Sequence, residues 1–278
     1  MTTENHLERL INYIHNQDVL DGLRSLPNEC ADLIIADPPY NLNKNFGIWD
    51  EKRVKDEWLS WSKQWLDESK RVLRSGGNIF VYGIHHHLCW LQCHMYEIGL
   101  TYRRQIIWYY ENGFAGYSAR TLAAHYEPLL WFSKGANYTY HPIREPYKSQ
   151  ERLKHKITKN GKVWEPHPDG RLAGDVWNFP TLAGKRFKDE KVNHPTQKPL
   201  SISLRIVRHF SNENDLVIVP FAGSGTECLA SVMENRQFIG FELNPDYIDI
   251  ANKRINDWNS TTQITSDSQA DRDNLMKD

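Results

Sequence analysis

Four consecutive apolar residues, Leu33 to Ala36, are followed directly by Asp37-Pro38-Pro39. A strand that is apolar at every position is typical of a parallel sheet whose two faces are both covered by helices. Proline fixes φ and has no N–H to continue the ladder, so the strand must end there in a stiff turn. The sequence therefore predicts a buried central strand with a rigid acidic loop at its carboxyl end.

Helical and extended patterns alternate on both sides of this strand. Apolar residues recur at helical spacing in a short segment ending near Leu26 and over 57–73, 86–98, 202–210, 226–234 and 247–258. Short apolar runs lie between them at 13–16, 78–82, 105–109, 128–132, 216–220 and 238–242. Such alternation predicts an α/β fold with a doubly wound, mostly parallel sheet.

Between residues 135 and 191, prolines and basic residues replace this pattern. Twelve Lys and Arg stand against seven Asp and Glu over 144–191, although the whole chain has a formal net charge of −1. A basic segment on a mildly acidic body is typical of a polyanion-binding face, and equally of a solvated loop. We therefore predict one domain in two halves, 1–134 and 192–258, an insertion at 135–191, and a polar, disordered tail at 259–278.

Composition and the polar N-terminus argue against export or membrane insertion. No apolar run approaches the ~20 residues that span a bilayer, and four cysteines in 278 residues do not make a disulfide framework. We expect a cytoplasmic protein with no membrane partner. Histidines and cysteines cluster between His85 and His94, but the distant second ligand pair of a zinc site is missing, so no metal site is predicted.

The loop Asp37-Pro38-Pro39-Tyr40 suits one particular reaction. The exocyclic amino group of a base such as adenine is a poor nucleophile, because its lone pair is delocalised into the ring. A carboxylate and a backbone carbonyl that accept its two N–H bonds would free the lone pair for attack. Asp37 and the carbonyl of Pro38 provide such acceptors, and Tyr40 offers a face on which the base stacks.

A second loop, from Val219 to Thr226, has features of a ligand site between a strand and a helix. Its glycines allow the backbone to approach a ligand closely. Glu242 follows at the end of the next strand, where an acid can accept both hydroxyls of a ribose, as in dinucleotide folds. The segment His194-Pro195-Thr196-Gln197-Lys198-Pro199 leads into the preceding helix, and its residues alone assign it no role.

Together, Asp-Pro-Pro-Tyr, Phe-x-Gly-Ser-Gly-Thr and His-Pro-Thr-Gln-Lys-Pro resemble the amino-methyltransferase family of bacterial DNA modification enzymes. The order of catalytic loop, variable basic segment and cofactor loop resembles the β group of that family. The resemblance covers residues 12–258. It implies a Rossmann-like methyltransferase sheet that is circularly permuted and carries an inserted target-recognition region.

The resemblance also implies S-adenosylmethionine as cofactor and double-stranded DNA as partner. The loop of Asp37, Pro38, Pro39 and Tyr40 would hold a flipped-out base. The residues expected at the cofactor are Asp18, Asp37, Lys198, Phe221, Gly223, Ser224, Gly225, Thr226 and Glu242. The candidates for DNA contact in the insertion are Arg144, Lys148, Arg152, Lys154 and Arg171. A cognate restriction endonuclease and a homodimer are left open.

One position departs from the family pattern, because Val219 stands where members usually carry Asp before the Pro-Phe of the cofactor loop. That acid is expected near the cofactor's amino group, whose binding would here rest on Asp37, Lys198 or water.

The leading function is site-specific methylation of N6 of adenine in DNA. N4 of cytosine is an alternative, although members with that target more often carry Ser at the position of Asp37. Methylation of RNA or of a protein amide, and DNA binding with a vestigial pocket, are the remaining alternatives.

Overall fold

A computed structural model describes residues 3–41, 54–84, 87–112 and 122–275 of the chain. Within these ranges the helices are α1 (Thr3–Glu8), α2 (Val19–Ser25), α3 (Lys55–Val72), α4 (Leu88–Glu97), α5 (Leu200–Phe210), α6 (Thr226–Met233) and α7 (Pro245–Leu275), with 3-10 turns η1 (Gln150–Lys154) and η2 (Lys185–Phe187). None of the helices in the described part of the chain combines the length and apolar character needed to cross a membrane.

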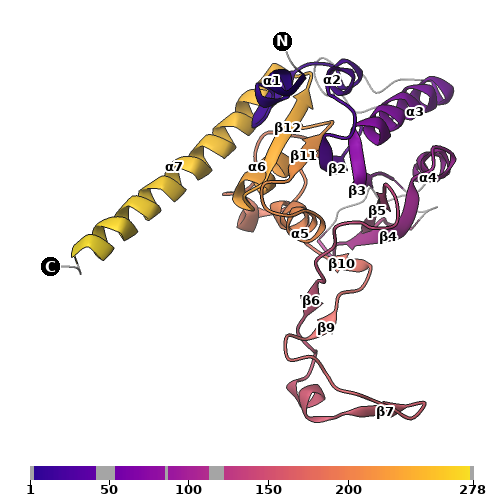
Figure 1. The fold of residues 1–278 in the computed structure, drawn as a ribbon, viewed down its shortest axis with the longest axis vertical. Coiled ribbons are helices and arrows are strands. Elements are labelled where there is room, and N and C mark those ends of the chain that lie inside the picture. The colour runs from indigo at the N-terminus through magenta and orange to yellow at the C-terminus, as the bar shows by residue number, and fades with distance from the viewer. Residues whose placement is uncertain (1–2, 42–53, 85–86, 113–121, 276–278) are drawn as a thin grey trace.

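The main sheet has the strand order β1-β12-β11-β2-β3-β5-β4-β10. Its strands are β1 (Tyr13–Asn16), β2 (Ala31–Ala36), β3 (Leu73–Tyr82), β4 (Thr101–Tyr109), β5 (Tyr126–Ser133), β10 (Val176–Asn178), β11 (Leu216–Val219) and β12 (Gln237–Glu242). Only the pairings of β5 are antiparallel among these strands. The late strands β11 and β12 lie between the early strands β1 and β2 (Figure 1). The predicted mostly parallel sheet is confirmed, and its strand order is that of a circularly permuted arrangement.

Helices cover both faces of this sheet, as the apolar run of β2 predicts. The side chains of Leu33 and Ile35 pack in one core with α5, α6 and α7. Those of Ile34 and Ala36 pack in a second core with α2, α3 and α4. All four residues are fully buried, so β2 is an interior strand of a doubly wound fold.

β2 and β11 are parallel neighbours in the sheet. After β2 the chain continues to β3 on one side of this pair, and after β11 it continues to β12 on the other side, so the strand order reverses between them. Val217 lies opposite Leu33, and Ile218 lies opposite Ile34. Because parallel strands end at the same edge, the loops that follow Ala36 and Val219 emerge side by side. Open α/β sheets bind their ligands at such a point of reversal.

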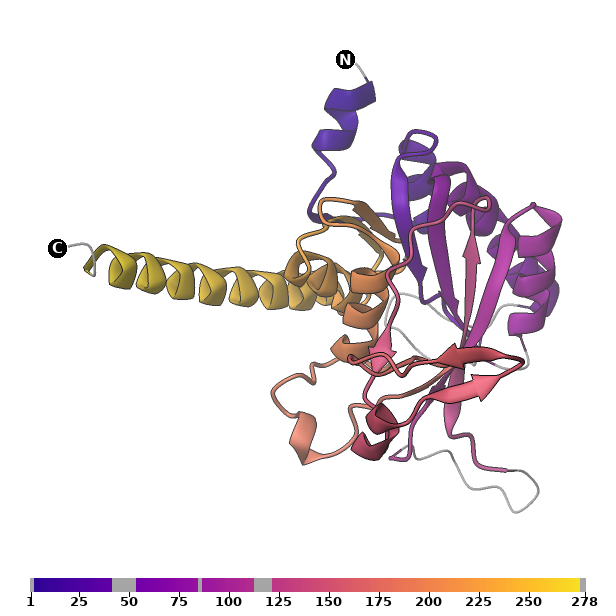
Figure 2. The same ribbon diagram turned by 60° about the horizontal axis from the view of Figure 1, so that its bottom comes forward.

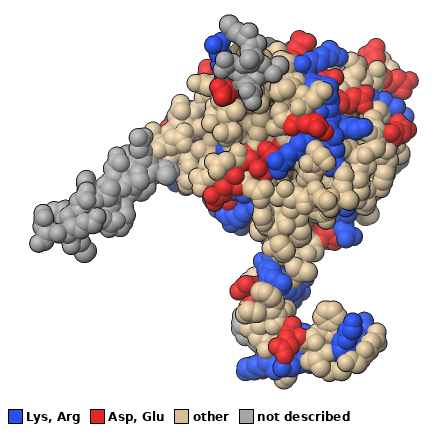
Figure 3. Space-filling model, viewed as in Figure 1, with Lys and Arg blue, Asp and Glu red and all other residues tan. Residues whose placement is uncertain are grey.

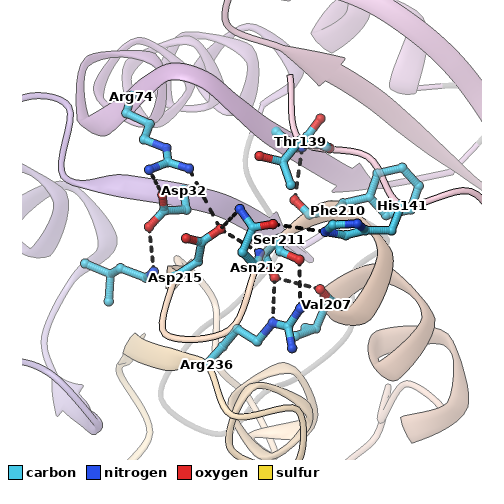
Figure 4. Close-up of polar contacts among 12 residues, drawn as sticks. Asp32, Arg74, Thr139, His141, Val207, Phe210, Ser211, Asn212, Asp215 and Arg236 are labelled. Atoms are coloured by element: carbon cyan, nitrogen blue, oxygen red, sulfur yellow. Dashed lines mark hydrogen bonds and ion pairs between the residues drawn. The ribbon is translucent and has the colours of Figure 1, made fainter. Parts of the chain in front are cut away.

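The opposite edge, where the strands begin, is held together by polar contacts (Figure 4). The Asp32 carboxylate accepts the backbone N–H of Leu216 at 2.6 Å and pairs with Arg74 at 2.5 Å. Arg236 donates to the hydroxyl of Ser211 at 3.0 Å and to its carbonyl at 2.7 Å. These bonds tie the amino ends of β2, β3 and β11 to one another, and the amino end of β12 to the end of α5.

The segment predicted as an insertion is less separate than expected. The pair β6 (Arg144–Glu145) and β9 (Arg171–Leu172), and the hairpin of β7 (Ile157–Lys159) and β8 (Lys162–Trp164), form an arm that extends from the body (Figures 1 and 2). The strand β10, however, pairs with β4 in the main sheet and buries Trp177. The expected boundaries 135–191 therefore enclose one strand of the main domain.

The C-terminal helix also differs from the expectation. α7 continues to Leu275, where the sequence predicted a disordered tail from residue 259, and the helix leads away from the sheet (Figure 2).

Candidate active site

A cavity opens at the carboxyl edge of the sheet, between the loops that follow β2 and β11. It is lined by residues from both halves of the domain, including Asp18, Asp37, Pro38, Pro39, Tyr40, Trp61, His194, Lys198, Phe221, Gly223, Ser224, Thr226, Glu227 and Glu242. Apart from Gly225, every residue predicted at the base or the cofactor lines this one cavity. The parallel pairing of β2 with β11 is what joins the two predicted loops.

Asp37 lies at the centre of a short hydrogen-bond network. The Tyr40 hydroxyl donates to Asp37 Oδ1 at 2.6 Å, and Lys198 Nζ lies 2.8 Å from Oδ2. The Asp37 side chain is 18% exposed. Both carboxylate oxygens thus have an internal donor that fixes their direction, and each keeps a further lone pair for a ligand.

Lys198 is a buried cation, with its side chain only 5% exposed. Burial alone would lower the pKa of its ammonium group, but the nearby Asp37 and Glu127 carboxylates outweigh burial and raise that pKa. Glu127, from β5, lies 3.5 Å from Lys198 Nζ and was not predicted at the site. Lys198 therefore stays charged and holds two carboxylates in place.

Two side chains from other segments hold the backbone of the catalytic loop, Asp37 to Tyr40, in place. Trp58 of α3 donates from Nε1 to the carbonyl of Pro39 at 2.9 Å. The Nδ1 of His87 lies 2.9 Å from the carbonyl of Tyr40. Burial raises the pKa of the Tyr40 hydroxyl well above its usual value, so this group acts as a donor to Asp37.

The glycine loop and Glu242 form the other end of the cavity. Glu242 accepts the backbone N–H of Gly223 at 2.9 Å and that of Asn244 at 2.8 Å, one on each oxygen. Gly223 has φ +49°, and a Cβ there would lie 3.0 Å from His194 Nε2. The loop therefore follows Glu242 closely, and a side chain at Gly223 would strain the left-handed backbone and crowd the His194 ring.

Asp18 and the residues after the glycine loop are fixed by similar contacts. Asp18 begins α2 and accepts the N–H of Leu20 at 2.8 Å. Arg254 of α7 donates to the carbonyl of Ser224 at 2.6 Å and to the hydroxyl of Thr226 at 3.0 Å. The helix α7 thus holds the end of the glycine loop through Arg254.

Gly225 is the predicted residue that does not line the cavity. It has φ +73°, and a Cβ there would lie 2.5 Å from the Cβ of Ala251. The glycine is required by the close approach of α7 rather than by a ligand.

Sequence reasoning gave no site role to several residues that line the cavity. Trp61, within the helical pattern of 57–73, is buried in the core and also lines the cavity, where it packs edge-on to Phe221 with ring centroids 5.7 Å apart. His194 received no role but contacts Tyr247 ring to ring at 4.4 Å. Glu227, in the first turn of α6, is 4% exposed and lines the cavity beside Thr226. Helical spacing could not mark Trp61 and Glu227, because a buried helix residue can face the core and the cavity alike, and His194 lies in the segment before α5, where no periodic pattern applies.

Val219 is buried at the end of β11, 1% exposed and packed in the core with α5 and α6. The position of the usual acid is therefore filled by an apolar side chain.

The five basic residues predicted to contact DNA lie on the arm, away from the cavity lining. Figure 3 shows lysine and arginine side chains spread along the arm, with acidic ones among them. Lys154 and Arg171 pair with carboxylates of the arm at 2.6 and 3.0 Å. Arg144 and Arg152 donate to backbone carbonyls, and Lys148 is exposed.

Within the described ranges, no group of three or more His, Cys, Asp or Glu side chains is arranged to hold a metal ion. His85 and His86, part of the histidine and cysteine cluster weighed as a metal site, lie outside those ranges.

Comparisons with known proteins agree with this geometry. A family model for N6 and N4 methyltransferases, described as DNA methylase, matches residues 31–253. The chain is 35% identical over 255 residues to Type II methyltransferase M1.MboII of Moraxella bovis, covering 88% of this chain and 97% of that relative. It is 33% identical over 243 residues to DNA adenine methyltransferase YhdJ of Escherichia coli strain K12, covering 86% and 80%. The solved structure of the M1.HpyAVI-SAM complex aligns with a TM-score of 0.60 at 25% identity, covering 88% and 98%.

Proposed function

The chain belongs to the N6 and N4 family of S-adenosylmethionine-dependent DNA methyltransferases, and on this premise we propose that it methylates N6 of adenine at a specific site in duplex DNA. The observation that carries the proposal is the joining of Asp37 and Glu242 in one cavity at the reversal of the sheet. Asp37 is proposed to bind the target base, and Glu242 is proposed to bind the cofactor.

The residues at the glycine end fit S-adenosylmethionine. Glu242 is oriented by two backbone N–H groups and keeps free lone pairs toward the cavity for the ribose hydroxyls. Because Gly223 has no side chain, the loop backbone can approach a ligand closely. Phe221 and Trp61 add apolar surface to the cavity wall. Asp18 is assigned to the adenine end, and Lys198, Ser224 and Thr226 to the methionine end. When bound, the cofactor supplies an electrophilic methyl group.

Asp37 is proposed to orient and activate the target amine. Its carboxylate accepts one N–H of the amino group, and the carbonyl of Pro38 accepts the other, which directs the nitrogen lone pair out of the ring plane. Tyr40 and Lys198 fix the carboxylate before the base arrives, so little reorganisation accompanies attack. The Tyr40 ring borders the cavity, where a base can stack on it.

A base inside a duplex cannot reach an acid that is 18% exposed in a recessed cavity. The target nucleotide must therefore leave the stack, as it does in other enzymes that act on a base. The arm is proposed to contact the duplex while this happens, since eight Lys and Arg against four Asp and Glu lie between residues 144 and 172. Arg144, Lys148, Arg152, Lys154 and Arg171 are the proposed contacts. That the chain has a cognate restriction endonuclease as partner, or forms a homodimer, stays a prediction.

Adenine is proposed over cytosine for two reasons. Asp37 stands where, by resemblance, cytosine-specific members more often carry Ser, and one relative is named a DNA adenine methyltransferase. N4 of cytosine is the alternative, because the family model covers both amines. Nucleoside analysis of DNA methylated by the purified protein separates them: N6-methyladenine is expected, and N4-methylcytosine would contradict the proposal.

The role of Asp37 is tested by Asp37→Ala. Loss of a positioned acceptor should lower the rate of methyl transfer about a hundred- to a thousandfold, while duplex DNA binding, measured by fluorescence anisotropy, should change less than about threefold. Lys63→Gln, on the exposed surface of α3, serves as the matched control and should keep full activity. Full activity of Asp37→Ala would refute the mechanism.

A further inference from the structure

Glu227 is a buried carboxylic acid for which the proposed mechanism has no use. It lies in the first turn of α6, is 4% exposed and borders the same cavity as Asp37 and Lys198. The Ser203 hydroxyl donates to its Oε1 at 3.0 Å. Burying an acid is costly, and the hydrogen bonds from Ser203 and from the helix backbone do not offset burial, which raises the pKa of Glu227.

The charges around Glu227 favour a cationic ligand. Burial, followed by the nearby Asp37 carboxylate, raises the pKa of Glu227. The charge of Lys198 lowers the pKa of Glu227 in part, but its ammonium group is paired with Asp37 and Glu127. Arg254 also feels the Glu227 charge, but its guanidinium donates to the carbonyl of Ser224 and the hydroxyl of Thr226 in the glycine loop. A positive group between Glu227 and Asp37 would relieve the repulsion between them.

The position of Glu227 also matches an acid that is missing elsewhere. The strand before the glycine loop ends in Val219, which is buried and apolar, where the resemblance leads one to expect Asp. Glu227 lies across the same strand-to-helix turn, after the loop instead of before it. This chain thus lacks an acid on one side of the turn and has one on the other.

We propose that Glu227 binds the α-ammonium group of S-adenosylmethionine, in place of the acid that Val219 replaces. The inference rests on the cofactor half of the proposed function. Glu227 is then a cofactor-binding residue that sets the position of the methionine end, and with it the direction of the methyl group toward Asp37.

The test is a comparison of two ligands with two proteins by calorimetry. S-adenosylhomocysteine carries the ammonium group, and its desamino analogue lacks only that group. Wild type should bind the desamino analogue about 10- to 100-fold more weakly, the usual loss for a charge-assisted hydrogen bond. Glu227→Gln keeps the shape and the bond to Ser203, and should bind both ligands with nearly equal affinity.

5′-Methylthioadenosine, which lacks the whole amino-acid end, supplies the control. It should bind wild type and Glu227→Gln equally, whereas Glu242→Gln should weaken the binding of all three ligands through the ribose. An unchanged ligand ratio in Glu227→Gln would overturn the inference and leave the proposed function standing. If wild type bound none of the ligands, the proposed function itself would fall.

Discussion

Gly225 is where the glycine loop and α7 come closest, and an alanine there should force them apart. Its φ is +73°, and an added Cβ would lie 2.5 Å from the Cβ of Ala251 and 3.1 Å from its Cα. Rotating a side chain cannot relieve that overlap, so α7 must move. We expect a loss of ~1–2 kcal/mol for the left-handed backbone and ~1–3 kcal/mol for the displaced helix, about 2–5 kcal/mol in all.

Gly99 supplies a matched control. Its φ is +80°, and the nearest atom to an added Cβ is the flexible Nζ of Lys70 at 3.9 Å. Gly99→Ala should therefore lose only the backbone part, ~1–2 kcal/mol. Adding Ala251→Gly to Gly225→Ala removes the overlapping methyl group. The double variant should be more stable than the sum of the two single changes by ~1–3 kcal/mol.

Urea unfolding followed by circular dichroism measures the free energy of unfolding of all four variants. Calorimetry with S-adenosylmethionine adds a second readout, because Arg254 of the displaced helix holds Ser224 and Thr226. Gly225→Ala should weaken cofactor binding, and Gly99→Ala should not. The reasoning is refuted if Gly225→Ala costs no more than Gly99→Ala, or if Ala251→Gly brings no recovery.

Two further predictions concern pH and salt. Burial lowers the pKa of His194 from 6.5 to about 4, so between those values the unfolded chain takes up a proton that the folded protein does not. Stability should fall by at most about 3 kcal/mol as the pH drops through this window, and His194→Gln should flatten that part of the curve measured by urea unfolding. The salt dependence of DNA binding tests the arm. Lys159 and Lys162 lie opposite each other in its exposed hairpin. If both contact phosphates, Lys159→Gln with Lys162→Gln should reduce the slope of log affinity against log salt by about 1.8 in anisotropy titrations; an unchanged slope would place the hairpin off the DNA.

The central elements could be predicted because their signals are local. Leu33 to Ala36 is apolar at every position, and only a strand covered on both faces buries all of it. The prolines after Asp37 marked the end of that strand, and Glu242 ends β12 as expected. That β2 and β11 are neighbours in space came from the structure, since no residue pattern in either strand indicates its partner.

The remaining features depend on contacts between distant segments. β10 is three residues long and buries only Trp177, so its pairing with β4 left no periodic pattern to read. Gly225 was expected at the cofactor, and the sequence could not show that Ala251 of α7, far along the chain, packs against it. Glu227 looks like an ordinary acid in a first helical turn, and only the folded cavity distinguishes it.

The parallel pairing of β2 with β11 also has a consequence for synthesis of the chain. About 180 residues separate β2 from its partner β11 in the sequence. At ~5–20 residues per second, β11 is therefore synthesised roughly 10–40 s after β2. Throughout that time, one side of a wholly apolar strand has no partner for its backbone N–H and C=O groups. Unpaired edges of this kind join other nascent chains readily. Truncation before residue 216 should therefore yield aggregates rather than a soluble half-enzyme, and chaperone capacity should limit the yield of the full-length protein.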